Sequence, residues 1–147
     1  DLSIVRPTLI YGHKDPHNGY GPNQFFKLLS KGKDISLFGK GEEERDHVYI
    51  YDVAKLINKL VLSHHNGILN IASGEVTTFK KIANKINNLY SDKVSVIDHP
   101  RIGEMPHGGY RSFNIDKITK LFPKYKMTSI NDGLKDYFKK INVKKGK

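Results

Sequence analysis

Tyr51 and Lys55 have the spacing of a catalytic Tyr-x-x-x-Lys pair. In such a pair both side chains lie on one helix face, and the lysine lowers the tyrosine pKa so that the phenol transfers protons near neutral pH. Asp52 is a plausible helix N-cap, which predicts that Tyr51 lies before the helix, at a strand end. Lys55 falls on the polar side of that helix. We therefore interpret the match as a coincidence in a pattern with only two fixed positions.

The seven histidines form no recognisable metal-binding pattern. His64 and His65 are adjacent and face different directions on a helix, and the other five are scattered through loops and strands. The sequence contains no His-Glu-x-x-His or Cys-x-x-Cys spacing and no credible Ser-His-Asp set. We therefore predict no metal site in this chain.

The formal net charge of +10 suggests an anionic partner, such as nucleic acid, an acidic surface or a phosphorylated small molecule. Most lysines fall on polar helix faces or in the tail at residues 139–147, which indicates a solvated surface. A nucleic-acid site would need stacking aromatics between the lysines, whereas most aromatics here follow apolar stripes typical of a core. Because the chain has no cysteine and no apolar run of ~18 residues, we expect a cytoplasmic protein without a membrane anchor.

Strands and helices that alternate along the chain predict an α/β fold. The nearly continuous apolar stretch at 2–7 predicts a strand buried on both faces of a parallel sheet, which suggests that sheet-forming sequence precedes it. Gly32 and Gly67 are predicted to stop helices, and Ser129 is predicted to cap the last one. The predicted strands cover 2–7, 35–39, 45–50, 68–72 and 94–98; the predicted helices begin near 22, 52, 77, 116 and 129, and 143–147 is expected to be a frayed basic tail.

Four segments together are more specific than any one of them. In chain order they are "RPTLIYG", "ISLFGKGEEERDHVYIYDVAKLI", "GILNIASGEVTTFKKIANKI" and "RIGEMPHGGYRSFNIDKITKLFPKYKMTSINDGLKDYF". This order resembles the C-terminal half of the extended short-chain dehydrogenases/reductases, the NAD-dependent nucleotide-sugar epimerases and dehydratases. The resemblance runs from Leu2 to about Lys140. It implies the C-terminal part of a Rossmann-type, doubly wound fold, including the small substrate-binding domain.

For the domain organisation, the resemblance implies one unit over residues 1–147, in which the last part of the NAD-binding sheet is interleaved with the substrate-binding domain. The N-terminal Rossmann half would be absent from this chain and would be its partner. The family's Arg-Pro-x-x-x-Tyr-Gly loop corresponds to Arg6, Pro7, Tyr11 and Gly12. These residues would pass beside the nicotinamide of NAD or NADP, which the missing half would mainly bind.

The substrate implied by the resemblance is a nucleotide-diphosphate sugar. Its base would lie along a short strand, its diphosphate would meet arginines, and amide side chains at a helix start would approach it. Arg111 would either reach the phosphate or cover the short helix that follows. The substrate-binding candidates are Asn23, Gln24, Leu37, Phe38, Arg45, Arg101 and Arg111.

Arginine at positions 45 and 101 agrees with phosphate recognition. Only four of the 25 basic residues are arginines, and a planar guanidinium binds a diphosphate bidentately in a way that lysine does not. Each charge-assisted hydrogen bond contributes ~1.5–3 kcal/mol. The alternative is a simple ion pair with a neighbouring acid: Arg45 with Glu44 or Asp46, and Arg101 with Glu104.

The sequence also departs from the family pattern. Leu9 stands where many members have an asparagine that binds substrate, and Ile102 and Glu104 replace the usual proline and aspartate. No Gly-x-Gly-x-x-Gly occurs among the thirteen glycines, so no glycine-rich turn is present to hold the cofactor pyrophosphate. We therefore expect this chain alone to be inactive.

The sequence thus predicts the substrate-binding part of a nucleotide-sugar epimerase or dehydratase, and a homodimer is the expected state of the parent. In the family, the cofactor oxidises a sugar hydroxyl to a ketone, which is then reduced from the other face or loses water. Isomerase, lyase and oxidoreductase outcomes all stay open, as do the base and the sugar. The alternatives are a non-catalytic nucleotide-sugar-binding relative, a chain that works with a separate N-terminal chain, or a basic nucleic-acid-binding module.

Overall fold

The computed structural model describes residues 2–17 and 19–142, and its strands and helices alternate as expected for an α/β chain. The predicted tail at 143–147 lies outside the described residues. In chain order the elements are β1 (Ser3–Pro7), β2 (Leu9–Tyr11), α1 (Pro22–Leu29), β3 (Ile35–Phe38), β4 (Glu44–Tyr49), α2 (Ile50–Leu62), β5 (Gly67–Ile71), β6 (Val76–Thr78), α3 (Phe79–Asn87), β7 (Val96–His99), the 3-10 helix η1 (Pro106–Gly109), β8 (Tyr110–Arg111), α4 (Asp116–Leu121) and α5 (Ile130–Asn142).

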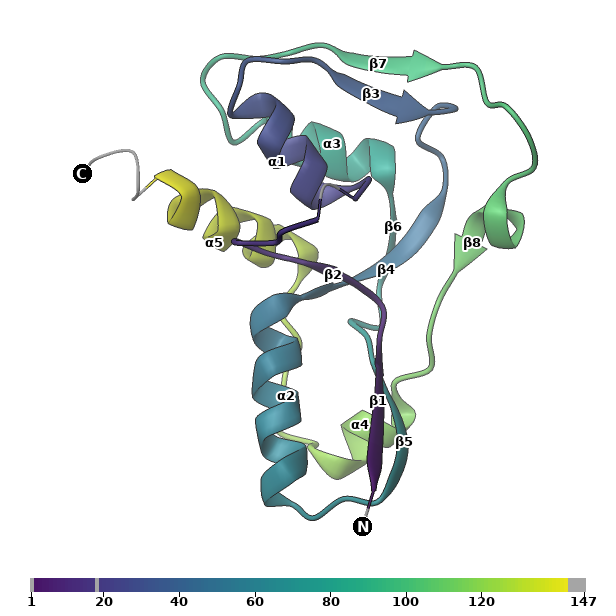
Figure 1. Cartoon of the computed structure of the whole chain (residues 1–147), viewed down its shortest axis with the longest axis vertical. Helices are drawn as coiled ribbons and strands as arrows, with labels where there is room; N and C mark the ends of the chain where they lie inside the picture. Colours follow the sequence, from purple (N-terminus) through teal and green to yellow (C-terminus); the bar gives the residue numbers. More distant parts are fainter. Residues whose placement is uncertain (1, 18, 143–147) are drawn as a thin grey trace.

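Strand β4 lies at the centre of the molecule, between its two ends (Figure 1). It pairs in parallel with β2 and β8 and antiparallel with β6. A parallel pair of β1 and β5 lies at one end beside α2 and α4, and a parallel pair of β3 and β7 lies at the other end beside α1 and α3 (Figure 1). Parallel pairing needs long crossovers, and the helices between the paired strands supply them.

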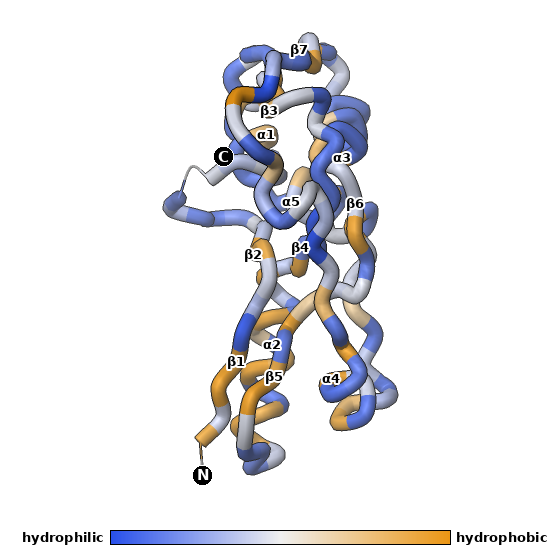
Figure 2. The backbone as a smooth tube through the Cα atoms, turned by 90° about the vertical axis from the view of Figure 1, so that its right-hand side faces the viewer, coloured by the Kyte–Doolittle hydropathy of each residue, from blue (hydrophilic) through white to orange (hydrophobic). Residues whose placement is uncertain are grey.

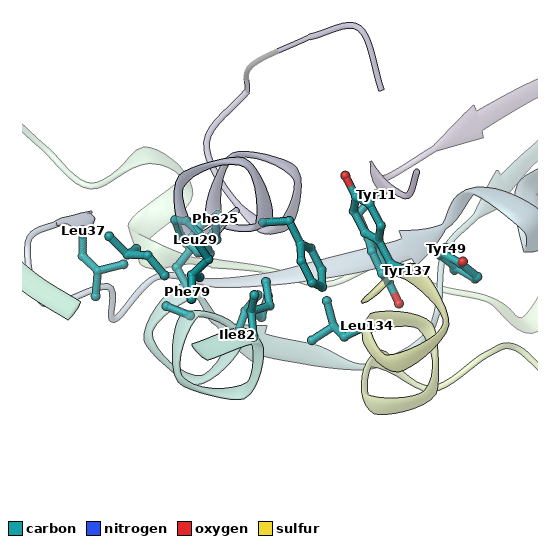
Figure 3. Close-up of a cluster of buried hydrophobic side chains, with 13 residues drawn as sticks. Tyr11, Phe25, Leu29, Leu37, Tyr49, Phe79, Ile82, Leu134 and Tyr137 are labelled. Atoms are coloured by element: carbon teal, nitrogen blue, oxygen red, sulfur yellow. The ribbon is translucent and has the colours of Figure 1, made fainter. Parts of the chain in front are cut away.

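Two hydrophobic clusters fill the two ends. In the first, apolar side chains at helical spacing on α1, α3 and α5 face one another (Figure 3). In the second, one face of α2 packs under β5. The first cluster includes Phe25, Phe26, Leu29, Phe79, Ile82, Ile86, Leu134 and Tyr137, and the second includes Val53, Leu56, Leu60, Leu69 and Ile71.

Several helix ends follow the sequence signals. Pro22 occupies the first turn of α1, where its missing N–H costs nothing. Thr78 is the N-cap of α3 and accepts a hydrogen bond from the Lys81 N–H at 3.1 Å. Ser129 does the same for α5, because its Oγ accepts the Asp132 N–H at 3.1 Å. Four of the five predicted helix starts, those near 22, 77, 116 and 129, are therefore confirmed.

The predicted start of α2 is wrong. The helix begins at Ile50, and Asp52 lies inside its first turn instead of capping it. Tyr51 therefore does not precede the helix, and it shares one face of α2 with Lys55 four residues later. The Asp52 carboxylate is bound elsewhere: it accepts hydrogen bonds from the Tyr125 hydroxyl at 2.6 Å and from the Thr128 N–H at 2.8 Å. These donors lie far along the chain, so local sequence could not reveal them.

The end of α2 and the environment of β1 also differ from expectation. The helix ends at Leu62, and His64 adopts the left-handed conformation there, whereas Gly67 begins β5. Among the described residues, β1 pairs only with β5, and Leu2 is 66% exposed. Figure 2 shows hydrophobic residues along both strands. The strand expected to be buried on both faces is therefore an exposed, apolar edge in this chain.

A buried carboxylate fixes the centre of the fold. Asp46 on β4 is fully buried and accepts three hydrogen bonds from the turn after β5. The donors are the Ser73 N–H and Oγ, each at 2.8 Å, and the Gly74 N–H at 2.9 Å. Because a buried charge needs such partners, Asp46 ties β4 to the segment that leads into β6.

We predict that Asp46→Asn lowers the free energy of unfolding by about 2–3 kcal/mol, because the amide loses the charge-assisted bonds and turns an N–H toward a main-chain donor. Denaturant unfolding followed by circular dichroism measures this loss. The control is Asp92→Asn at an exposed position, which should change stability by less than about 0.5 kcal/mol. Equal effects of the two substitutions would contradict the role given to Asp46.

The next residue of β4, His47, is buried in its neutral form. Its Nδ1 lies 3.2 Å from the Arg45 carbonyl oxygen, which only accepts, so this nitrogen carries the proton. Burial lowers the His47 pKa from its ordinary value of 6.5 to about 4, and the Arg45 charge acts in the same direction against that hydrogen bond. The unfolded chain therefore binds a proton between these pH values that the folded chain does not.

Stability should consequently fall as the pH drops from 6.5 to 4, with a contribution from His47 of up to about 3 kcal/mol. We predict that His47→Phe, which keeps an aromatic ring beside Phe79, removes this component of the pH dependence. Denaturant unfolding at a series of pH values tests it. The exposed His64→Asn is the control and should retain the decline, and an unchanged decline in His47→Phe would refute the assignment.

Candidate functional site

Two adjoining pockets lie where β2 meets β4. The larger one has a volume of about 990 Å³ and the smaller one about 530 Å³. Thr8, Leu9 and Tyr20 line both pockets and so form the boundary between them. The Thr8 hydroxyl donates a hydrogen bond of 2.8 Å to the Asp46 carbonyl oxygen, which fixes this boundary on β4. Groups bound in the two pockets would therefore lie next to each other.

Arg45 lies in the wall of the larger pocket and is only 7% exposed. Its guanidinium donates to the Glu44 and Pro106 carbonyl oxygens, both at 2.9 Å, and to the Glu43 carboxylate. Position 45 is on β4 and Pro106 begins η1, so the arginine joins two segments far apart in sequence. A nearly buried cation held by three acceptors has little conformational freedom.

Arg101 reaches the same carboxylate from the loop after β7. Its Nη1 lies 2.6 Å from Glu43, its Nε lies 3.5 Å from Glu42, and its Nη2 donates to the Phe38 carbonyl oxygen at 3.4 Å. Glu43 therefore bridges Arg45 and Arg101. The arginines do form ion pairs, but the expected partners Glu44, Asp46 and Glu104 are wrong: the carboxylates involved are Glu43 and Glu42.

Arg111 joins these arginines through a strand that the sequence did not predict. Strand β8 pairs with the start of β4 so that Arg111 lies opposite Arg45. The Arg111 guanidinium donates to His107 Nε2 at 2.9 Å and lies 5.2 Å from the centre of the Phe113 ring. Three of the four arginines of the chain thus line the larger pocket or its wall.

The two residues proposed to lie along a base face opposite sides of β3. Leu37 is 1% exposed and packs in the first hydrophobic cluster (Figure 3), whereas Phe38 is 63% exposed and lines the larger pocket. The Phe38 ring lies 4.5 Å from the Tyr20 ring, and the Tyr20 hydroxyl accepts the Phe38 N–H at 3.1 Å. An aromatic surface is therefore available at Phe38, and any contact from Leu37 would come from its main chain.

The smaller pocket contains Tyr11 and Asn23. The Tyr11 hydroxyl is buried and has no hydrogen-bond partner in the described part of the chain. Burial raises its pKa, and the charges of Asp52 and Asp132 add to the effect. Asn23 donates to Asp15 at 2.9 Å and accepts the Gly12 N–H at 3.0 Å, so it shapes the loop at 12–17.

The remaining candidates are more dispersed. Pro7 lines the larger pocket, while Arg6 is exposed on β1 and Gln24 is partly buried on α1, and neither of them lines either pocket. Tyr51 and Lys55 also lie outside both pockets. Tyr51 contacts Lys140, whose Nζ lies 4.5 Å from the centre of the ring. The structure therefore brings together Phe38, Pro7 and three arginines, which are Arg45, Arg101 and Arg111. It separates them from Arg6 and Gln24.

Sequence reasoning missed Glu43 and Tyr20. Glu43 was grouped into an acidic surface turn, although it lies two residues before Arg45, a spacing that places side chains on one side of an extended chain. Tyr20 sits in a loop rich in glycine and histidine and gave no local signal. Within residues 2–17 and 19–142, no cluster of three or more His, Cys, Asp or Glu side chains could hold a metal ion.

Neither described stretch of the chain contains a helix long and apolar enough to cross a membrane.

Comparison with known proteins gives a consistent result. Residues 1–72 match the model of the NAD dependent epimerase/dehydratase family. A putative UDP-glucose 4-epimerase of Methanocaldococcus jannaschii is 34% identical over 109 residues, which are 71% of this chain and 35% of that protein. An ADP-L-glycero-D-manno-heptose-6-epimerase of Fusobacterium nucleatum is 32% identical over 133 residues, which are 82% of this chain and 39% of that protein. The chain thus spans well under half of the length of these relatives.

The fold agrees with this assignment. The crystal structure of a UDP-glucose 4-epimerase from Thermotoga maritima, bound to UDP-glucose, superposes with a TM-score of 0.76 at 23% identity. The match covers 95% of this chain and 46% of that one. The α/β arrangement with parallel strands is therefore that of part of a Rossmann-type epimerase, consistent with a C-terminal portion. Together with the matching segment at 1–72, this shows that the chain belongs to the NAD-dependent epimerase/dehydratase family.

Proposed function

We propose that this chain is the substrate-binding portion of an NAD(P)-dependent nucleotide-sugar epimerase or dehydratase. The observation that carries the proposal is the convergence of Arg45, Arg101 and Arg111 on one pocket that also exposes an aromatic ring. These residues come from β4, β8 and the loop after β7, so only the folded chain collects them. Guanidinium groups with an aromatic surface are suited to a ligand that joins phosphates to a base.

In this arrangement the diphosphate would lie between Arg45 and Arg101, and Phe38 would pack against the base. Arg111 would face the phosphates from the β8 side or, if it stays on Phe113, support that wall of the pocket. Desolvated arginine–phosphate contacts are strong because both partners are charged. The names of the similar proteins support this substrate class, since each acts on, or is bound to, a sugar attached to a nucleoside diphosphate.

The sugar would then extend across Leu9 toward the smaller pocket. NAD or NADP, when bound, would accept and return a hydride at the sugar carbon. Tyr11 lines the smaller pocket, but its buried hydroxyl lies against Gly133 of α5 and would not reach the cofactor. The residues of this chain do not suit the cofactor pyrophosphate either, because no glycine-rich turn is present. The remaining cofactor contacts would come from the N-terminal part of the protein.

We predict that Arg101→Ala in the complete enzyme weakens UDP binding by about 1.5–3 kcal/mol, because the diphosphate loses a charge-assisted hydrogen bond. Isothermal titration calorimetry measures the affinity. The affinity of Arg101→Lys should fall between those of wild type and Arg101→Ala, since lysine keeps the charge and lacks the planar guanidinium. The control is Lys40→Ala at an exposed lysine of the neighbouring turn, and an unchanged affinity in Arg101→Ala would remove the basis of the proposed function.

We further predict that Phe38→Ala weakens UDP binding by about 1–3 kcal/mol, the usual contribution of stacking between a base and an aromatic ring. Binding of inorganic pyrophosphate, which has no base, should change by less than twofold. Competition titrations with both ligands give the comparison. A parallel loss for the two ligands would show that Phe38 supports the pocket structurally and does not contact the base.

A further inference from the structure

Glu43 is the acidic residue most closely associated with the arginine pair. Its side chain is only 12% exposed, and its two oxygens contact different arginines, Oε2 with Arg45 and Oε1 with Arg101. These are the only partners that the structure gives to the carboxylate among the described residues. Glu43 also lines the larger pocket, so the carboxylate that bridges the two guanidinium groups is part of the pocket wall.

This placement neutralises the cations that a diphosphate would use. Arg45 has its remaining contacts with two carbonyl oxygens, and Arg101 has one distant contact with each of Glu42 and the Phe38 carbonyl oxygen. A second anion that approached while Glu43 stayed in place would meet a like charge within the same small region. Glu43 also already occupies Arg45 Nη2 and Arg101 Nη1, whereas Arg101 Nε has no hydrogen-bond partner among the described residues.

We propose that Glu43 is an internal competitor for the arginine pair, which a nucleotide diphosphate must displace in order to bind. The proposal rests on the proposed function and adds to it a residue that sets ligand affinity. The apparent affinity of a ligand falls by the fraction of molecules in which its site is free, so a carboxylate that holds both arginines weakens binding. In the empty pocket the same contacts keep Arg45, a nearly buried cation, paired.

The alternative role for the same residue is alignment. In that case Glu43 stays in place, holds the two guanidinium groups in position, and a ligand uses their outer N–H groups. The two roles predict opposite signs. Removal of the Glu43 charge strengthens diphosphate binding if the residue competes, and weakens it if the residue aligns the arginines.

The test is UDP and inorganic pyrophosphate binding by calorimetry to four forms of the complete enzyme: wild type, Glu43→Gln, Glu104→Gln and Arg101→Ala. Glu104 lines the same pocket and forms no ion pair with any residue of 2–17 or 19–142, so Glu104→Gln removes a negative charge without releasing an arginine. We expect Glu43→Gln to bind both ligands about tenfold more tightly, because the neutral amide holds the two guanidinium groups less strongly and leaves the site free in more molecules. Glu104→Gln, which releases no arginine, should stay within about twofold of wild type.

Thermal unfolding of each variant checks that the fold is retained. Glu43→Ala is a second variant, and it should bind both ligands at least as tightly as Glu43→Gln does. Weaker or unchanged binding in a folded Glu43→Gln, or an equal gain in Glu104→Gln, would overturn the proposal while leaving the Arg101→Ala loss intact. No loss in Arg101→Ala would instead overturn the proposed function, and the competitor role would fall with it.

Discussion

Two opposite charges buried side by side in β4 constrain the rest of the structure. Arg45 and Asp46 are both nearly inaccessible to water, and consecutive strand residues point to opposite faces. Each therefore needs partners of its own: the turn at 73–74 supplies donors to Asp46, while Glu43 and the Pro106 carbonyl oxygen supply acceptors to Arg45. An unpaired buried charge is strongly destabilising, so these distant segments hold one another in place. The larger pocket forms at their junction.

The fold was predictable where local sequence decides it. The caps of α3 and α5 and the apolar stripes of the helices follow from residue type and spacing alone. The elements and contacts that were not predicted depend on residues far along the chain. Strands β6 and β8 have three and two residues, and they form because β4 offers them free main-chain groups. Asp52 looked like an N-cap because nothing near it in sequence shows that Tyr125 and Thr128 will occupy its oxygens.

The candidate site was predictable in its cations and not in its acids. Arginine stands out in a lysine-rich chain, so its positions could be chosen by residue type. Three consecutive glutamates at 42–44 look equivalent in sequence, and only the path of the chain through the turn decides that Glu43 faces both Arg45 and Arg101. The case of Leu37 and Phe38 is different. Alternation along a strand already implies that only one of them faces a ligand, so the period of two was the signal that the resemblance obscured.

Net charge and local charge act on an anionic ligand at different distances. The formal charge of +10 is carried mainly by lysines, and it attracts any anion, within a screening length of about 10 Å at 0.1 M salt. At the larger pocket the balance is different, because Glu43 and Glu104 line it together with Arg45, Arg101 and Arg111, and Glu42 lies beside Arg101. Long-range attraction therefore brings anions to the surface without selecting among them. The geometry of the pocket selects the ligand. A ligand has to offer the guanidinium groups of Arg45 and Arg101 better acceptors than the Glu43 carboxylate, which contacts both of them.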